Sequence, residues 1–295
     1  MSEDKSSQIS KKEELFERLL NAIDFQFEEG TEDLPILDWA KGVNLGAGPF
    51  QTEGHEYQLP MLQEEAIRQV YKKGAQMGVT EVNVLKSMYG LISSRYPQGV
   101  LYLFPTVNDV SDFSKGRFGP LLDDNPQISD LVRNTDSVSV KRIRKAMLYL
   151  RGARATGKIE GIKKTSSSLK GIPVDRIVFD EVDEMDPAML DLALERLSHS
   201  KVKEEAYLST PSIPDFGIDK LYNESDERVW MIKCQKCGVE ACLEIEFPNC
   251  LLELPDGGVI RVCKSCKNEI FPRDGQWVAQ HPSRSKDLVG AHKVF

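Results

Sequence analysis

Short apolar segments alternate with an amphipathic segment along the middle of the chain, and this pattern predicts the secondary structure. The strands are predicted at residues 69–73, 99–104, 146–150, 176–179 and 206–208. Residues 100–104 are apolar throughout and end at Pro105, as expected for a strand buried on both faces. Apolar residues at helical spacing predict a helix over 82–94. Such alternation favours a mostly parallel, doubly wound sheet that binds ligands at the carboxyl ends of its strands.

The first 60 residues give weaker signals. Residues 1–30 are predicted as a polar tail and a helix, because Leu15, Leu19, Leu20 and Ile23 recur at helical spacing. Residues 31–60 contain many glycines and prolines and are expected to form an extended arm with little regular structure. Pro60 is expected to open a helical stretch over 61–67, since proline is tolerated in a first helical turn.

Composition narrows the class of protein. Hydrophobic residues make up 40% of the chain and charged residues 28%, as in ordinary soluble domains. No apolar run approaches the roughly 20 residues that a membrane span needs. The N-terminus has no apolar core of a signal peptide, so we expect the protein to be made and kept in a cytosol.

The net charge of −8 argues against nucleic-acid binding, but the charge is unevenly distributed. Residues 1–38 hold eleven acidic and four basic residues, whereas residues 141–170 hold ten basic residues and one acidic residue. The basic block is either a strip that faces phosphates or a solvated surface loop, and both interpretations remain open.

A glycine-containing loop lies between the first predicted strand and the predicted helix. It consists of Lys73, Gly74, Ala75, Gln76, Met77, Gly78, Val79 and Thr80. A strand–loop–helix junction can bind an anion through backbone N–H groups and the helix dipole. The standard phosphate loop has a lysine directly before Ser/Thr, where Val79 stands here. Lys73, at the other end, is long and flexible enough to reach the phosphates instead. Taken alone, the loop is better explained as an ordinary glycine-containing turn between a strand and a helix.

Two adjacent carboxylates end the strand predicted at 176–179. Asp180 is placed to hold Mg²⁺ together with the hydroxyl of Thr80, and Glu181 to orient the attacking water. Adjacent carboxylates repel each other unless a cation or solvent offsets them, so a metal site is favoured over core packing. Ser209 and Thr210 follow the next predicted strand and are candidates for sensing a γ-phosphate, although Ser-Thr-Pro-Ser is also a common turn.

All six cysteines lie between Cys234 and Cys266. Two CxxC pairs, Cys234 with Cys237 and Cys263 with Cys266, supply the four thiolates of a tetrahedral Zn²⁺ site and predict a zinc ribbon. A redox role for either pair is the alternative. The remaining two cysteines are expected to pack in the interior.

In this order, the motifs resemble the large terminase subunit of tailed phages, particularly the lambda-like GpA family. The resemblance spans about residues 57–295 and rests on KGAQMGVTE, VLYLFPTVNDVSDFSKGRFGPLL, SSSLKGIPVDRIVFDEVDEM, LSTPS and the CxxC pairs. It implies an α/β P-loop NTPase of the additional-strand, catalytic-glutamate type, with a mostly parallel sheet flanked by helices and a small zinc ribbon. The implied activity is ATP hydrolysis that pumps double-stranded DNA into a procapsid in the host bacterial cytoplasm.

The resemblance also implies roles for individual residues. Lys73 and Thr80 would serve phosphate and magnesium, Asp180 magnesium, Glu181 catalysis, and Ser209 with Thr210 coupling. The family places its adenine-contacting segment at Tyr57 and Gln58. Arg117 is the first candidate for an arginine finger and Arg154 the second, although either could face DNA or be structural. The implied ligands and partners are ATP, Mg²⁺, Zn²⁺, DNA, a portal ring, a small terminase subunit and further copies in a ring, with no membrane.

The resemblance divides the chain at three boundaries. We expect an acidic helix and arm at 1–56, the ATPase domain at 57–228, the zinc ribbon at 229–280, and a segment at 281–295 that leads to a missing nuclease domain. Family members continue into an RNase H-like nuclease, so nuclease activity is not expected from these residues. The chain is then a fragment, a naturally split subunit, or an ATPase served by a separate nuclease.

Two other functions remain open. One is a helicase-like DNA-remodelling ATPase that shares the motifs. The other is a zinc-ribbon module that binds DNA or protein and carries an inactive ATPase fold, because the standard loop lysine is missing.

Overall fold

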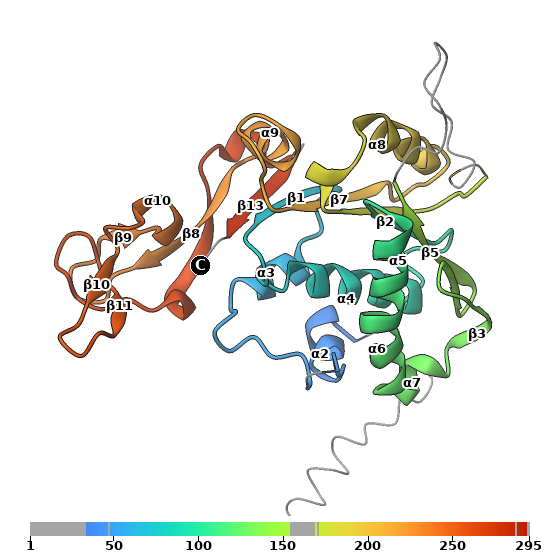
Figure 1. Ribbon diagram of the computed structural model, residues 1–295, viewed down its shortest axis with the longest axis horizontal. Coiled ribbons are helices and arrows are strands. Elements are labelled where there is room, and N and C mark those ends of the chain that lie inside the picture. Colours follow the sequence, from blue (N-terminus) through green and yellow to red (C-terminus); the bar gives the residue numbers. More distant parts are fainter. Residues whose placement is uncertain (1–33, 47, 154–168, 170, 287, 294–295) are drawn as a thin grey trace, which may run out of the picture.

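The computed structural model describes residues 34–46, 48–153, 169, 171–286 and 288–293 (Figure 1). The helix expected within residues 1–30, Arg154 and most of the basic block after it lie outside these residues. Within the described residues no helix combines the length and apolarity that crossing a membrane requires.

One mixed sheet of eleven strands, counted over the described residues, forms the centre of the fold. Its spatial order is β12-β8-β13-β1-β7-β6-β2-β5-β4-β3, and β9 pairs with β8. The strands are β1 (Arg68–Lys73), β2 (Val100–Phe104), β3 (Val132–Asp136), β4 (Val140–Ile143), β5 (Ala146–Gly152), β6 (Arg176–Asp180), β7 (Glu204–Ser209), β8 (Arg228–Lys233), β9 (Glu240–Ala241), β12 (Gly275–Ala279) and β13 (Val289–Lys293).

The central strands are parallel, as the alternating pattern predicts. β8, β13, β1, β7, β6, β2 and β5 form parallel pairs, whereas β12, β9, β4 and β3 are antiparallel to their neighbours. β2 and β6 are buried along their whole length, because helices cover both faces of the sheet. The five predicted strands are all present, and their ends lie close to the predicted ones.

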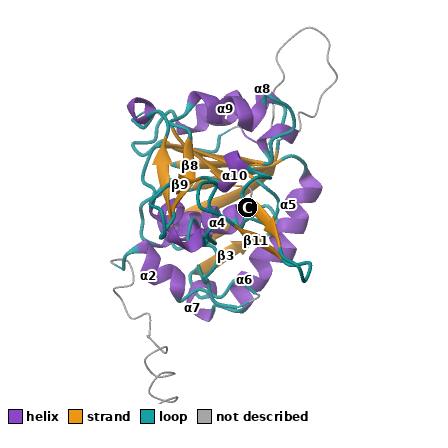
Figure 2. Ribbon diagram, turned by 90° about the vertical axis from the view of Figure 1, so that its left-hand side faces the viewer, coloured by secondary structure: helices purple, strands orange, loops and turns teal. Residues whose placement is uncertain are grey.

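Helices lie on both faces of the sheet (Figures 1 and 2). Residues of α2 to α7 pack into the larger apolar core, and residues of α8 and α9 into the second core on the opposite face. The helices are α2 (Ile36–Lys41), α3 (Gln58–Gln63), α4 (Val79–Ile92), α5 (Val107–Phe113), α6 (Gly119–Asp123), α7 (Pro126–Ser129), α8 (Pro187–Leu194) and α9 (Gly217–Glu224). A π-helical turn, Ser114–Phe118, joins α5 to α6.

The segment at 31–60 is more regular than an extended arm. α2 lies within it, and its Trp39 and Ala40 are buried in the larger core. α3 begins at Gln58 rather than after Pro60, so this proline lies in the first turn of the helix. Tertiary burial of a few apolar side chains stabilises these short helices despite the nearby glycines and prolines.

The last third of the chain joins the sheet with β8, leaves it, and returns to it with β12 and β13. β8, β12 and β13 join the central sheet, while α10 (Leu243–Glu246) and the hairpin of β10 (Leu251–Glu253) and β11 (Val259–Arg261) lie beyond β8 at one end of the molecule (Figure 1). The segment at 281–295 therefore contains a strand that pairs with β1, the strand before the glycine loop.

Candidate nucleotide site and candidate metal centre

Three adjacent parallel strands end at the same edge of the sheet. β7 lies between β1 and β6, so the carboxyl ends of these strands bring Lys73, Asp180 and Ser209 to one place. A strand inserted between the loop strand and the acidic strand is the arrangement that the sequence resemblance implies. This edge is where open α/β sheets bind their ligands.

The glycine loop runs directly from β1 into α4. Two of its residues have a left-handed backbone, Gln76 at φ 60° and Gly78 at φ 68°, and α4 begins one residue later at Val79. The first turn of a 14-residue helix offers backbone N–H groups and the positive end of its dipole. Loop and helix start are therefore suited to binding a phosphate chain.

The charged side chains of the site contact one another. Lys73 Nζ donates a hydrogen bond to Glu181 Oε1 at 2.6 Å, and Thr80 Oγ1 to Asp180 Oδ1 at 3.4 Å. Lys73 is nearly buried, whereas Glu181 is about one-third exposed. The displaced lysine thus reaches the acidic strand end across the intervening strand.

Glu181 has an unusual backbone conformation. Its φ of 63° and ψ of 58° place a non-glycine residue in the left-handed region, which costs of order 1–3 kcal/mol and is often found at functional sites. Ser209 Oγ and Thr210 N donate to Glu181 Oε2 at 3.2 and 3.3 Å. The two residues expected to sense hydrolysis therefore contact the carboxylate expected to promote it.

Asp180 is a buried carboxylate with two hydroxyl neighbours. Burial raises its pKa to about 6, nearby Lys73 opposes the rise, and Glu181 adds to it. Tyr102, in β2, donates to Asp180 Oδ2 at 3.0 Å. Together with Thr80, Asp180 forms an oxygen donor set that fits Mg²⁺.

Asp180→Asn is expected to raise the melting temperature of the nucleotide-free protein at pH 8, because it removes a buried negative charge. The pKa of Asp180 in the folded state lies above the unfolded value of about 3.9. At pH values between these two pKa values, folding is accompanied by uptake of a proton. The charge of Asp180 therefore destabilises the fold less as the pH falls through about 6. The stabilisation of the variant, at most about 3 kcal/mol at pH 8, should therefore shrink at pH 5. Thermal unfolding of both proteins at the two pH values measures it, and an unchanged difference would contradict it.

Tyr57 and Gln58 lie against the glycine loop. The Tyr57 hydroxyl and Gln58 Nε2 both donate to the carbonyl of Met77, at 2.8 and 3.0 Å, and both side chains are buried. The segment that the family resemblance assigns to adenine contact thus holds the loop from the side of α3. Contact with adenine itself remains a prediction.

Gly78→Ala is expected to weaken ATP binding and lower stability by about 1–3 kcal/mol. A Cβ there would lie 2.3 Å from Gln58 Nε2 and would sit on a backbone at φ +68°. The double variant Gly78→Ala/Gln58→Ala removes the clash but keeps the backbone strain. It should recover only part of the ATP affinity, because the bond from Gln58 to the Met77 carbonyl is also lost. Titration of a fluorescent ATP analogue measures the affinity. Wild-type affinity in the single variant would show that the loop tolerates a side chain here.

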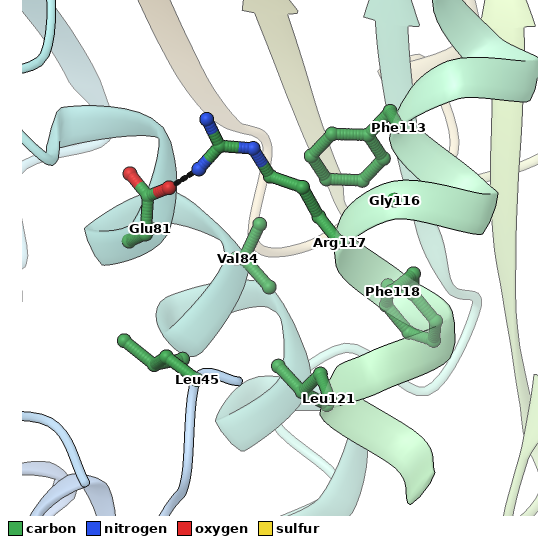
Figure 3. Close-up of a pocket in the computed structure, with 8 residues that line it drawn as sticks. All are labelled: Leu45, Glu81, Val84, Phe113, Gly116, Arg117, Phe118 and Leu121. Carbon is green, nitrogen blue, oxygen red and sulfur yellow. Dashed lines mark ion pairs between the residues drawn. The ribbon is translucent and has the colours of Figure 1, made fainter. Parts of the chain in front are cut away.

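Arg117 lies in the π-helical turn, beside a pocket of about 140 Å³ (Figure 3). Its guanidinium forms an ion pair with Glu81, one residue beyond Thr80, and the Arg117 side chain is 60% exposed. Apolar side chains of Leu45, Val84, Phe113, Phe118 and Leu121 also line this pocket. The structure thus places Arg117 next to the first turn of α4.

Two side chains at the site were not found from sequence. Tyr102 lies in a strand whose sequence is otherwise aliphatic or aromatic without polar atoms. Its hydroxyl, which bonds to Asp180, is the one polar side-chain group in that strand. Asp183 is the second of these side chains. Its carboxylate accepts hydrogen bonds from Ser212 N and Oγ and from Ile218 N, at 2.7–2.8 Å. It therefore connects the segment after β6 with the segment that joins β7 to α9.

The four cysteines of the two CxxC pairs converge. The sulfur atoms of Cys234, Cys237, Cys263 and Cys266 all lie within 4.8 Å of one another. The Sγ atoms of Cys234 and Cys266, and those of Cys237 and Cys263, are each 3.6 Å apart. Tetrahedral Zn–S bonds of about 2.3 Å place sulfurs roughly 3.8 Å apart, so this geometry fits Zn²⁺. Cys242 and Cys250 are buried outside the group.

The strand order and the loop define a P-loop NTPase fold of the additional-strand type. The chain belongs to the family of phage terminase large subunits of the gpA type. The family model described as "Phage terminase large subunit gpA, ATPase domain" matches residues 48–281.

The chain is also similar to solved structures of phage terminases. The large terminase ATPase domain of Thermus phage P74-26 is 14% identical, with a TM-score of 0.48, over 84% of this chain and 82% of that one. A mutant of that domain is 15% identical, with a TM-score of 0.45, over 61% of this chain and 72% of that one. The large terminase of another phage, a thermophilic bacteriophage, is 15% identical, with a TM-score of 0.42, over 60% of this chain and 43% of that one. No curated protein matches.

Proposed function

We propose that this chain is the ATP-hydrolysing motor of a DNA-packaging terminase, which moves double-stranded DNA into a procapsid. The observation that carries the proposal is the meeting of Lys73, Thr80, Asp180, Glu181 and Ser209 at one edge of the sheet. Membership of the terminase ATPase family supports it.

The proposed roles follow from the positions of the side chains. The glycine loop and Lys73 bind the phosphates of ATP, and Thr80 and Asp180 hold Mg²⁺. The chemistry that Mg²⁺ supplies when bound is neutralisation of charge on the phosphates. Glu181 accepts a proton from the attacking water and orients it toward the γ-phosphate.

Ser209 and Thr210 are proposed to transmit the result of hydrolysis. Both contact Glu181, and the backbone N–H of Asp183 donates to Ser209 Oγ at 3.3 Å. Because Asp183 also holds Ser212 and the start of α9, a change at Glu181 reaches this helix through hydrogen bonds alone. α9 is therefore our candidate for the moving element.

Arg117 is proposed as the arginine finger. In a ring of copies, the finger of one copy would act on the nucleotide bound by its neighbour. Its ion pair with Glu81 is exposed, so the guanidinium can exchange partners at low cost. A portal ring and a small terminase subunit are the other proposed partners, and a separate or missing domain would supply nuclease activity.

DNA is proposed to contact the basic block through its exposed side chains. Arg142 and Lys145 are exposed, whereas Arg144 donates to the Ile92 carbonyl and Arg151 to the Ser139 carbonyl. Within the described part of the block, basic residues thus divide into exposed ones and ones that bond to the fold.

Steady-state ATP hydrolysis with and without duplex DNA tests the proposal. We expect DNA to stimulate hydrolysis, and Arg142→Glu/Lys145→Glu to weaken DNA binding and reduce the slope of log affinity against log salt by about 2. Lys201→Glu, an exposed lysine outside the block, is the control. No hydrolysis under any condition would favour the zinc-ribbon module, and an unchanged salt slope would exclude these two residues from the DNA contact.

A further inference from the structure

A fully buried ion pair joins the zinc ribbon to the central sheet. Lys293, in β13, pairs with Glu244, in α10, and the two side chains are 0% and 1% exposed. α10 lies between the two CxxC pairs in sequence, and β13 is the neighbour of β1. The pair therefore connects the ribbon to the strand that leads into the glycine loop.

Stability alone is a poor explanation for this pair. Two charges lose their hydration when buried, and apolar residues of similar volume are often as stable or more stable at such positions. A buried pair does restrict geometry, since each charge must keep its partner. The pair thus fixes the position of Lys293 relative to its other neighbours.

Lys293 is connected to the glycine loop at two points. Its backbone carbonyl accepts a hydrogen bond from the N–H of Gly74 at 2.9 Å. Its Nζ lies over the ring of Tyr57, 5.4 Å from the centroid, and the Tyr57 hydroxyl donates to the carbonyl of Met77. One residue therefore holds the first glycine of the loop directly and its middle through Tyr57.

The strands that flank the ribbon hold the same tyrosine. Trp277, in β12, donates its indole N–H to the Tyr57 carbonyl at 3.0 Å, and the ring of Trp230, in β8, lies edge-on to Tyr57 at 6.3 Å. The first CxxC pair follows β8 and the second precedes β12. The two strands that contact Tyr57 are therefore the strands between which the ribbon folds.

We propose that Lys293 is a positioning residue that sets the glycine loop according to whether the zinc ribbon is folded, through its ion pair with Glu244 and its contact with Tyr57. Zinc binding then increases the affinity of the loop for ATP. This inference rests on the proposed nucleotide site. Lys293 is not a catalytic residue, because its ammonium is enclosed by Glu244 and Tyr57.

The test is a cycle that combines zinc removal with an uncharged pair. Lys293→Met/Glu244→Met replaces both charges with apolar side chains of similar length, so neither charge is left buried alone. We expect this variant to keep one zinc per chain and to melt within a few degrees of wild type. It should bind a fluorescent ATP analogue about tenfold more weakly, with kcat at saturating ATP changed less than twofold.

Zinc removal by a chelator should weaken ATP binding about tenfold in wild type and clearly less in the double variant, where only the contacts of Trp230 and Trp277 with Tyr57 still connect the ribbon to the loop. Tyr57→Phe, which keeps the ring but loses the bond to Met77, should weaken ATP binding without changing the zinc content. The control is Lys264→Met, which removes another ion pair to α10, with Glu246, and should leave ATP affinity unchanged.

Four outcomes would overturn the proposal. Wild-type ATP affinity in the zinc-loaded double variant would do so, as would an equal loss on chelation in both proteins. A wild-type protein that hydrolyses ATP but binds it equally well with and without zinc would refute only this inference. Wild type that binds no ATP at all would refute both this inference and the proposed function.

Discussion

Glu181→Gln is expected to reduce ATP turnover by about 10²–10⁴-fold while ATP binding is retained. Glutamine keeps an oxygen that accepts from Ser209 Oγ and Thr210 N, although it loses the ion pair with Lys73. It cannot accept a proton from water at neutral pH, so the chemical step fails. Single-turnover hydrolysis and equilibrium binding of ATP, measured on the same preparation, separate the two effects.

The matched control is Glu184→Gln. Glu184 is an exposed carboxylate three residues away in the short helical turn after Glu181, so the substitution makes the same change of charge. Its turnover should equal that of wild type. Substantial turnover in Glu181→Gln, or an equal loss in both variants, would show that Glu181 is not the base and that net charge near the site matters instead.

Removal of zinc is expected to unfold the ribbon while the central strands stay folded. Structural zinc contributes about 10–16 kcal/mol in zinc-finger peptides, which exceeds what the few buried side chains of a small ribbon supply. Fast amide exchange should therefore appear over residues 234–271 on chelation, with β1, β6 and β7 still protected. Hydrogen exchange followed by mass spectrometry measures both regions at once.

Two single variants separate metal loss from a change of sequence. Cys263→Ser removes one sulfur of the group and should abolish zinc binding, whereas Ser265→Ala changes an exposed residue of the same CxxC turn and should retain one zinc per chain. Purified wild type without zinc, or a ribbon that stays protected after chelation, would rule out a structural metal.

The parts of this fold that were predictable have strong local signals. Residues 100–104 and 177–179 are continuous apolar runs, and both lie in strands that are buried along their whole length. The acidic pair at 180–181 marks a strand end because two carboxylates cannot share an apolar strand. The CxxC pairs predict their own convergence, since thiolates at that spacing suit one metal.

The parts that were missed depend on distant partners. β13 has the sequence Val-Gly-Ala-His-Lys, which is too short and mixed to read as a strand. It fits because Gly290 packs against Ser225, where a Cβ would lie 2.0 Å from the serine hydroxyl oxygen. The pairing of Lys293 with Glu244 spans 49 residues, and a single sequence contains no signal for such a pair.

The short contact between Lys73 and Glu181 joins the proposed phosphate-binding group to the proposed proton acceptor. The lysine is nearly buried, whereas the glutamate is about one-third exposed. On the proposed roles, an incoming triphosphate competes with Glu181 for the ammonium of Lys73, so the carboxylate loses its ion-pair partner when the triphosphate binds. On these roles, ATP hydrolysis depends on occupancy of the glycine loop, because Lys73 exchanges Glu181 for the triphosphate.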